Sequence, residues 1–223
     1  SVAIMVLFEE GKLLLDDPVS KYLPAFRKQQ VIATFNETDT TYTTIPAKSE
    51  ITIRQLLTHT SGLGYAQIGS KEANAIYAKA NLTAGIGVVG DDLLSAMNRL
   101  GKLPLMHQPG ERWTYGLNSD LLGCLVEQIS GKTLDQFFKE KIFEPLGMND
   151  THFHLPAAKA TRLVKLYREL PGGKLEKSSG NMLNGRTITP DYPLEGSTYY
   201  SGGAGLSSTI EDYAIFLQML LNG

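Results

Sequence analysis

The sequence predicts a mostly helical fold of the α+β class. Two observations support this prediction. Apolar segments with helical spacing and N-terminal capping residues recur along the chain, and one later segment alternates as a β-hairpin would. The chain has 223 residues, of which 42% are hydrophobic and 20% charged. This composition is typical of globular proteins and allows one sizeable core or two small lobes.

The first quarter of the chain contains a helix and then a polar stretch. Residues 1–10 are largely apolar and stop at Gly11, which predicts a buried helix without a clear cap at its start. Asp17-Pro18 opens a short turn of helix, because proline suits the first helical position. Residues 28–50 are polar and rich in threonine, which indicates a surface loop or a short hairpin.

Three helices are predicted next. Thr52 and Gln55 have the spacing of a capping box, in which each side chain bonds the backbone of the other residue, and they open the first helix. Residues 70–80 and 91–100 predict two more helices, the second closed by Gly101.

The stretch 109–147 organises the rest of the chain. Pro109-Gly110 is a turn, and Glu111 to Tyr115 indicates a brief extended run that ends in aromatic residues. The polar patch 118–120 then opens an apolar helix that Gly131 closes. Tyr115 therefore lies at a loop tip beside a well-specified helix, which is the placement that a catalytic side chain needs.

The elements after Gly131 are predicted from the same signals. Thr133 and Gln136 indicate a second capping box and a second helix, which Pro145 and Gly147 end. Residues 161–169 alternate in part before a Pro-Gly-Gly turn, which predicts a hairpin, and residues 174–200 are predicted to be loop. Ser208 with Glu211 is predicted to cap the last helix.

Several ordered motifs resemble one known family. The first motif ends at Tyr115 and reads P-G-x-x-W-x-Y. Two further motifs follow it, D-L-L-G-x-L-V-E-x-I-S-G-K-T and F-x-x-x-I-F-x-P-L-G-M. Residues 9–24, 53–63 and 202–221 match the same family. Together they resemble the serine β-lactamase-related family, which includes class C β-lactamases, D-Ala-D-Ala peptidases and β-lactamase-like carboxylesterases. The resemblance implies a β-lactamase/DD-peptidase-like fold, of which this chain forms mostly the helical lobe with helices that flank an antiparallel sheet.

The resemblance also divides the chain. Residues 1–24 and 201–223 would be helices of an incomplete α/β sheet domain, and residues 25–200 would form the helical lobe with a short hairpin near 161–176. The first and last helices would then lack the sheet that they should cover. We therefore expect exposed apolar faces on both.

The chemistry implied by the resemblance is acyl transfer. In the family a serine attacks a carbonyl and forms an acyl-enzyme, which water then hydrolyses. The serine and a lysine share one helix face in an S-x-x-K motif, and a tyrosine phenol, its pKa lowered by that lysine, relays the proton. Tyr115 matches this catalytic tyrosine. On spacing alone, Tyr115 is better explained as an aromatic loop or core residue, and the surrounding motif reverses this preference in favour of the catalytic tyrosine.

The S-x-x-K motif itself is missing at its expected place. In the family it lies just upstream of the stretch that matches residues 1–5, and Ser1 is followed by Ile4 rather than lysine. The family's later K-T-G-like strand would follow Gly223, since Lys132-Thr133 lies between two helices. We expect either the middle of a longer enzyme, with the nucleophile outside this sequence, or an inert chain.

Residues next to Tyr115 bear on the substrate. Leu117 stands where β-lactamases and peptidases carry the amide of Y-x-N, and Asn118 follows as a predicted helix cap. Both are candidate substrate-binding residues. Because leucine cannot orient a substrate amide, the pattern favours a carboxylesterase on short acyl esters over a β-lactamase or D-Ala-D-Ala peptidase. The alternative from another class is a catalytically inactive binding homologue.

Two more stretches are substrate-binding candidates by the resemblance. The stretch 59–65, H-T-S-G-L-G-Y, matches a loop at the edge of the family's cleft, where Tyr65 or Gln67 would line the acyl pocket. His59 is better explained as a residue that pins this loop by hydrogen bonds. Ser201-Gly202-Gly203 resembles a glycine-rich turn near the nucleophile helix, and the glycines Gly202 and Gly203 also permit close backbone approach.

Other classes of function have little support. The net charge of −2 gives no electrostatic case for nucleic acid, and no apolar run approaches the ~18 residues of a spanning helix. Cys124 is the single cysteine and indicates a small buried hydrophobe. The G-x-G-x-x-G at 85–90 lacks a preceding strand, and His152 with His154 lacks a third ligand. We predict no cofactor, no metal and a small-molecule ester or β-lactam as partner; cytoplasmic and periplasmic locations, and the oligomeric state, are left open.

Overall fold

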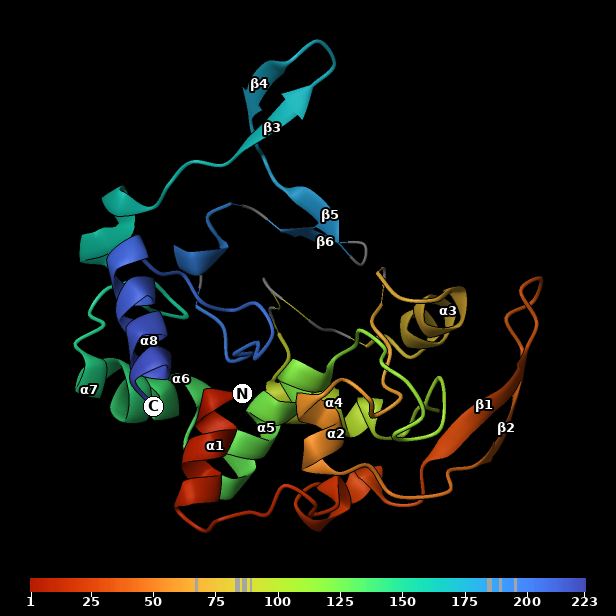
Figure 1. The fold of residues 1–223 in the computed structure, drawn as a ribbon. Coiled ribbons are helices and arrows are strands. Elements are labelled where there is room, and N and C mark those ends of the chain that lie inside the picture. Colours follow the sequence, from red (N-terminus) through yellow and green to blue (C-terminus); the bar gives the residue numbers. More distant parts are fainter. Residues whose placement is uncertain are drawn as a thin grey trace.

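Helices form the body of the molecule, and β-hairpins lie at its periphery (Figure 1). The computed structural model describes residues 1–66, 68–82, 85, 88, 90–183, 186–188, 190–194 and 196–223. The helices are α1 (Val2–Glu9), α2 (Ile53–Leu57), α3 (Lys71–Lys79), α4 (Leu93–Leu100), α5 (Asn118–Ser130), α6 (Leu134–Phe138), α7 (Glu144–Leu146) and α8 (Ile210–Asn222). The strands are β1 (Gln30–Phe35), β2 (Tyr42–Pro46), β3 (Tyr167–Leu170), β4 (Lys174–Lys177), β5 (Asn181–Leu183) and β6 (Arg186–Ile188). The α+β class predicted from the sequence is confirmed.

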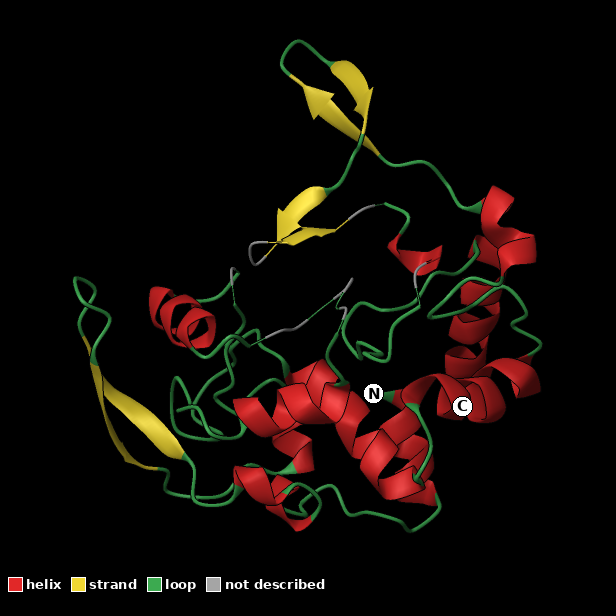
Figure 2. Ribbon diagram, turned by 180° about the vertical axis from the view of Figure 1, so that it is seen from behind, coloured by secondary structure: helices red, strands yellow, loops and turns green. Residues whose placement is uncertain are grey.

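The central element is α5, which packs against α1, α2, α4 and α6 (Figure 1). Figure 2 shows the helical body from behind. A helix surrounded in this way must be apolar on nearly every side. Its middle turns meet that requirement, because each of six consecutive residues is buried: Leu121, Leu122, Gly123, Cys124, Leu125 and Val126. Gly131 then ends the helix in the left-handed conformation, with φ of 69°, as the sequence predicts.

Two of the predicted capping residues, Thr52 and Thr133, open helices where expected. The Thr52 hydroxyl accepts from Gln55 N at 3.2 Å, and the Gln55 side chain accepts from Thr52 N at 3.0 Å, so the predicted capping box is confirmed. Thr133 accepts from Gln136 N at 3.3 Å and opens α6. The chain continues through a π-helical turn, Lys139–Phe143, into α7.

Two predicted helix starts are wrong by one residue. Thr209, not Ser208, caps α8, because its hydroxyl accepts from Asp212 N at 3.2 Å. Leu117 occupies the N-cap of α5 without a side-chain cap, so Asn118 is not the predicted cap. In both cases the side chain of the predicted cap, Ser208 or Asn118, bonds a residue elsewhere in the fold, and the residue just before or after it takes the N-cap position.

The strands confirm some expectations and correct others. β1 and β2 pair antiparallel, so the stretch 28–50 contains a hairpin. The hairpin predicted near 161–176 is also present, with β3 and β4 on either side of the Pro171–Gly173 turn. The stretch 174–200, predicted as loop, contains β4 and the further pair β5–β6. Glu111 to Tyr115 forms no strand.

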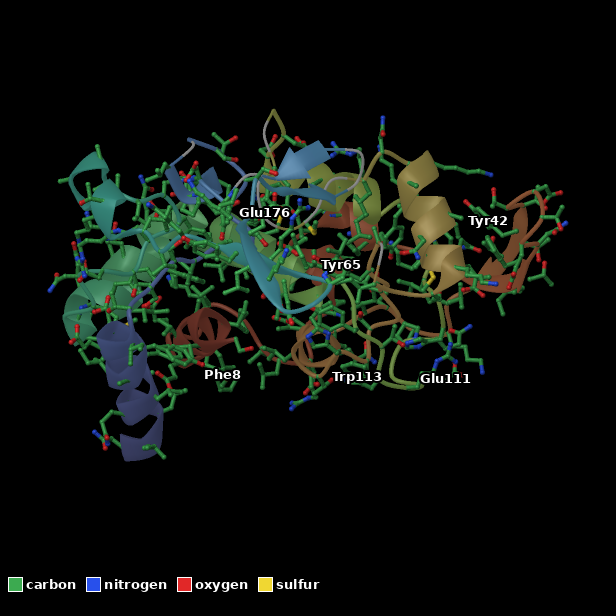
Figure 3. The ribbon with its side chains drawn as sticks, turned by 90° about the horizontal axis from the view of Figure 1, so that it is seen from above. Phe8, Tyr42, Tyr65, Glu111, Trp113 and Glu176 are labelled. Atoms are coloured by element: carbon green, nitrogen blue, oxygen red, sulfur yellow. The ribbon has the colours of Figure 1, made fainter. Side chains whose placement is uncertain are left out.

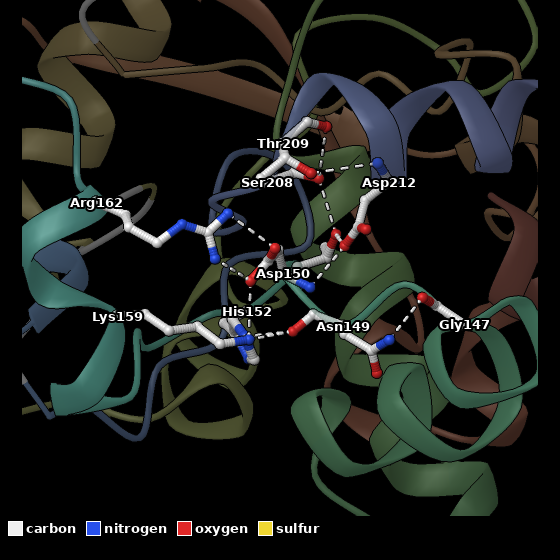
Figure 4. A network of polar contacts seen from close by, with 10 residues as sticks. Gly147, Asn149, Asp150, His152, Lys159, Arg162, Ser208, Thr209 and Asp212 are labelled. Atoms are coloured by element: carbon white, nitrogen blue, oxygen red, sulfur yellow. Dashed lines mark hydrogen bonds and ion pairs between the residues drawn. The ribbon is translucent and has the colours of Figure 1, made fainter.

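The start of α8 is anchored by a polar network (Figure 4). The Asp212 carboxylate accepts from Asp150 N and from the Thr151 hydroxyl, both at 2.8 Å. The Asp150 carboxylate in turn pairs with Arg162 at 2.6 Å and with Lys159 at 2.9 Å. These contacts fix the orientation in which α8 leaves the body of the molecule.

The remainder of α8 is mostly uncovered. Ile210 is 90% exposed and Leu221 81% exposed, and on α1 Met5 and Phe8 are each 37% exposed. The apolar exposure expected for the first and last helices is thus observed. None of the helices among the described residues is long and apolar enough to cross a bilayer.

Candidate active site

Two loops that are distant in the sequence are joined side by side and support Tyr115. One follows α2 and the other precedes α5. Three backbone hydrogen bonds connect them: Gly110 N to Thr60 O at 2.7 Å, Thr114 N to His59 O at 2.9 Å, and Leu117 N to Gly64 O at 3.1 Å. Because each bond fixes a backbone position beside Tyr115, the loop tip predicted from the sequence is held rigidly.

Glycine makes this close approach feasible. A Cβ atom on Gly116 would lie 2.1 Å from Leu63 O. Gly62 has a φ of +90°, and a Cβ atom there would lie 2.4 Å from His107 O. Any side chain at either position would push the two loops apart. The residue that follows Tyr115 must therefore be glycine for Tyr115 to keep its place.

The Tyr115 ring is part of an aromatic cluster. It stacks with His59, with centroids 5.8 Å apart and planes within 4°, and with Tyr65 at 5.4 Å and 21°. Trp113 lies 6.4 Å from Tyr115 and 6.1 Å from His59. Tyr115 is 46% exposed and Trp113 is 64% exposed, and Figure 3 shows Trp113 near the edge of the molecule. The phenol is therefore oriented by its neighbours and still reachable from solvent.

Asn118 links the cluster to the protein interior. Its side chain is fully buried, and its Oδ1 accepts from the Ser61 hydroxyl at 2.5 Å. Its Nδ2 lies 3.0 Å from Nδ1 of His59. Burial lowers the pKa of His59. The oxygen of the Asn118 amide is thus bonded to Ser61, and its nitrogen is bonded to His59.

A second buried contact ties α5 to the glycine-rich turn. The Ser201 hydroxyl donates to Oδ1 of Asp120 at 2.7 Å and accepts from the backbone N–H of Gly203 at 3.3 Å. Burial raises the pKa of Asp120, while the hydrogen bond from Ser201 opposes the rise. A Cβ atom on Gly202 would lie 2.2 Å from Ser119 O. The turn is thus pressed against the first turn of α5, four to five residues after Tyr115.

The predicted site residues are brought together to different degrees. Tyr65 is half-buried against Tyr115, and burial together with Asp120 raises its pKa to about 12. Leu117 is fully buried in the core and Asn118 is fully buried beside it, so we assign both a supporting role. Gln67 lies outside the described residues. Among the described residues no three His, Cys, Asp or Glu side chains gather as metal ligands would.

Sequence reasoning did not identify four residues of this arrangement as part of the site. These are the aromatic Trp113 and the buried polar residues Ser61, Asp120 and Ser201. Trp113 had a signal, since it is the single tryptophan and stands two residues before Tyr115. The polar residues had none, because their partners lie 57 and 81 positions away.

The helical body, the peripheral hairpins and the loop-borne tyrosine define a β-lactamase-like α+β fold. The family model described as Beta-lactamase matches residues 1–223, so the chain belongs to this family. Protein Rv1367c of Mycobacterium tuberculosis is 35% identical over 220 residues, covering 98% of this chain and 50% of that protein. Esterase EstB of Burkholderia gladioli is 31% identical over 219 residues, covering 95% and 52%.

A solved structure agrees in fold. EstCE1, described as a hydrolase with promiscuous acyltransferase activity, superposes with a TM-score of 0.76 at 27% identity, covering 98% of this chain and 55% of that one. The sequence spans about half the length of the relatives named above, since it covers 50% and 52% of them.

Proposed function

We propose that this protein is a serine hydrolase that works through an acyl-enzyme and prefers short acyl esters. The observation that carries the proposal is the placement of Tyr115. Its hydroxyl-bearing ring is partly exposed, yet two stacked rings and a set of backbone hydrogen bonds hold it in place. A proton relay needs such a combination of access and fixed geometry. The nucleophilic serine of this proposal is not among residues 1–223.

The preference for esters rests on Leu117 and Asn118. A substrate that carries an amide side chain would be recognised by a polar amide beside the tyrosine. Here Leu117 is buried in the core, and the amide of Asn118 is already bonded to Ser61 and to His59. No side-chain amide at these two positions is left to bind a substrate. The esterase and hydrolase relatives support the same preference.

Tyr65, Gly202 and Gly203 have proposed roles in binding. Tyr65 would contact the acyl group from its position against the Tyr115 ring. The turn at Gly202 and Gly203 would form a wall of the site, because Ser201 bonds both the Asp120 carboxylate and the backbone N–H of Gly203 and so holds the turn against α5. Gln67 remains a proposed neighbour of the acyl group on the evidence of the sequence alone.

The test uses the full-length protein and a fluorophosphonate probe. We expect one stoichiometric adduct on a serine, together with hydrolysis of a p-nitrophenyl ester and little turnover of a chromogenic cephalosporin. Faster cephalosporin turnover than ester turnover would instead support a β-lactamase or a peptidase. Absence of both the adduct and turnover would support the inactive binding homologue and would remove the proposed role of Tyr115.

A further inference from the structure

We propose that His59 is a positioning residue for Tyr115 and that buried hydrogen bonds hold it in its neutral Nε2–H form. This inference rests on the proposed function for its catalytic meaning, whereas the hydrogen-bond arrangement stands on geometry alone. Three side chains take part, Ser61, Asn118 and His59, and they lead from the interior to the Tyr115 ring.

The direction of the hydrogen bonds follows from a backbone group. Leu63 N–H is always a donor, and it bonds the Ser61 hydroxyl oxygen at 3.2 Å. The Ser61 proton is therefore available to Oδ1 of Asn118, 2.5 Å away. With its oxygen so placed, Asn118 presents its NH₂ group to Nδ1 of His59 at 3.0 Å. Nδ1 must then be the acceptor, and the ring proton belongs on Nε2.

Protonation of His59 would break this arrangement. A proton on Nδ1 would face the NH₂ group of Asn118, so that two donors would meet at a partly buried contact. Turning Asn118 over would make the Ser61 hydroxyl accept from both Leu63 N and the Asn118 amide nitrogen and would leave the Ser61 proton without its Oδ1 acceptor, so this exchange is unfavourable. His59 would have to move, and the ring of Tyr115 that stacks on it would lose its support.

The backbone of His59 also indicates a specific requirement. Its φ is 55°, in the left-handed region that glycine favours, and the residue follows Thr58, the C-cap of α2. Glycine would satisfy this position with less strain. A histidine there is consistent with a need for its ring, which contacts Trp113 and Tyr115.

The charged surroundings do not favour an imidazolium. The two segments that meet at His59, residues 54–65 and 107–120, carry these other titratable residues: Arg54, Tyr65, His107, Glu111, Arg112, Tyr115 and Asp120. Arg54 pairs with Asp16, and Arg112 pairs with Glu111. Asp120 accepts a hydrogen bond from Ser201. Burial is the main cause of the lowered pKa of His59, in agreement with a neutral ring.

The first test measures the fluorescence of Trp113, which lies 6.1 Å from His59, because an imidazolium quenches a neighbouring indole. The signal is defined as the part that Trp113→Phe removes. We expect it to fall as the pH decreases below 6.5, the ordinary pKa of histidine. His59→Asn should abolish the transition, and asparagine tolerates the left-handed backbone. Asn118→Asp should shift the transition to higher pH, because a carboxylate facing Nδ1 favours the imidazolium.

The second test measures ester hydrolysis by the full-length protein. The kcat of the unmodified protein should fall with decreasing pH over the range of the fluorescence transition. His59→Asn should lower kcat roughly ten- to a hundredfold, as small misplacements of catalytic groups do. It should change KM little, and Asn118→Asp should move the acid limb to higher pH. His152→Gln, in the network of Figure 4, is the matched control and should leave both readouts unchanged.

The outcomes separate this inference from the proposed function. If the fluorescence transition shifted in Asn118→Asp but the protein hydrolysed no ester, the enzyme proposal would be refuted and the hydrogen-bond arrangement would stand. If the pH profile of ester hydrolysis were the same in the unmodified protein, in His59→Asn and in Asn118→Asp, the positioning role would be overturned. A fluorescence transition that persists in His59→Asn, or does not move in Asn118→Asp, would overturn the arrangement itself.

Discussion

The hydroxyl of Ser201 donates a 2.7 Å hydrogen bond to the carboxylate of Asp120, across 81 positions of sequence. Both residues are buried, Ser201 to 3% exposure and Asp120 to 2%. A buried carboxylate is costly unless a hydrogen bond satisfies it, and here the Ser201 hydroxyl supplies one. The contact therefore joins the glycine-rich turn to the helix that begins just after Tyr115.

Two neighbouring glycines of this turn should differ in how well they tolerate substitution by alanine. Gly202→Ala places a Cβ atom 2.2 Å from Ser119 O, whereas in Gly203→Ala the nearest atom is Oδ2 of Asp120 at 3.4 Å. We expect Gly202→Ala to lower the free energy of unfolding by about 1–3 kcal/mol, as overpacking does. Gly203→Ala is the matched control and should change it by less than about 0.5 kcal/mol. Equal denaturation midpoints in urea for the two variants would contradict the close approach.

Local structure was predictable wherever its signal lies within a few residues. The capping box of Thr52 and Gln55 and the glycine end of α5 depend on neighbours in sequence, and both are present. Asn118 shows the limit of such reasoning. Its place before an apolar helix suggests a cap, but its side chain bonds Ser61 and His59, which are 57 and 59 positions away. Tertiary contacts of this kind compete with local ones, and one sequence does not reveal them.

The candidate site follows the same division. Tyr115 was identified from motif resemblance, and its loop placement was deduced from the turn before it and the helix after it. The stacking of Tyr115 on His59 was not deduced, since it depends on backbone hydrogen bonds between two loops. The extended run predicted at 111–115 does not become a strand, because Thr114 bonds His59 in the loop after α2 and not a neighbouring strand.

Asp17 provides a pH-dependent contribution to stability. Burial alone would raise its pKa, but hydrogen bonds from Lys21, Tyr22 and Leu14 N lower it from 3.8 to about 2. The stabilisation is therefore complete above the unfolded value of 3.8 and is lost as the pH falls towards 2. We expect Asp17→Asn to lose about 1–2 kcal/mol of unfolding free energy near neutral pH, since solvent screens part of the effect.

The test of Asp17 is a series of urea melts of the unmodified protein and the variant at decreasing pH. Their difference should be constant from neutral pH down to about pH 5 and then shrink as the carboxylate is protonated. Asp16→Asn is the control, because the Asp16 side chain is 72% exposed and its pair with Arg54 is solvated. A pH-independent difference for Asp17→Asn would mean that the ionised carboxylate is not the source of the stabilisation.

Cys124 should be unreactive in the folded protein. It is fully buried in the middle of α5, and burial, with Glu127 and Asp92 adding to it, raises the pKa of its thiol to about 12. The reactive thiolate is therefore scarce near neutral pH. We expect the peptide that contains Cys124 to remain unlabelled by iodoacetamide in native buffer and to be labelled fully in concentrated guanidinium chloride. Rapid native labelling would show that α5 is accessible to solvent.

The final prediction concerns the hydroxyl of Tyr115. Tyr115→Phe keeps the ring, so the stacking on His59 and Tyr65 should persist, and only the proposed proton relay is removed. In the full-length protein we expect kcat for ester hydrolysis to fall by roughly 10²–10⁴, which is the usual contribution of general acid–base catalysis. KM should change little, because the hydroxyl acts in the transition state. Tyr42→Phe, an exposed tyrosine on β2, is the control and should keep full activity. If Tyr115→Phe retained the unmodified rate, the proton relay would have to be assigned to another group, and Tyr115 would be left with the structural role that its stacking alone supports.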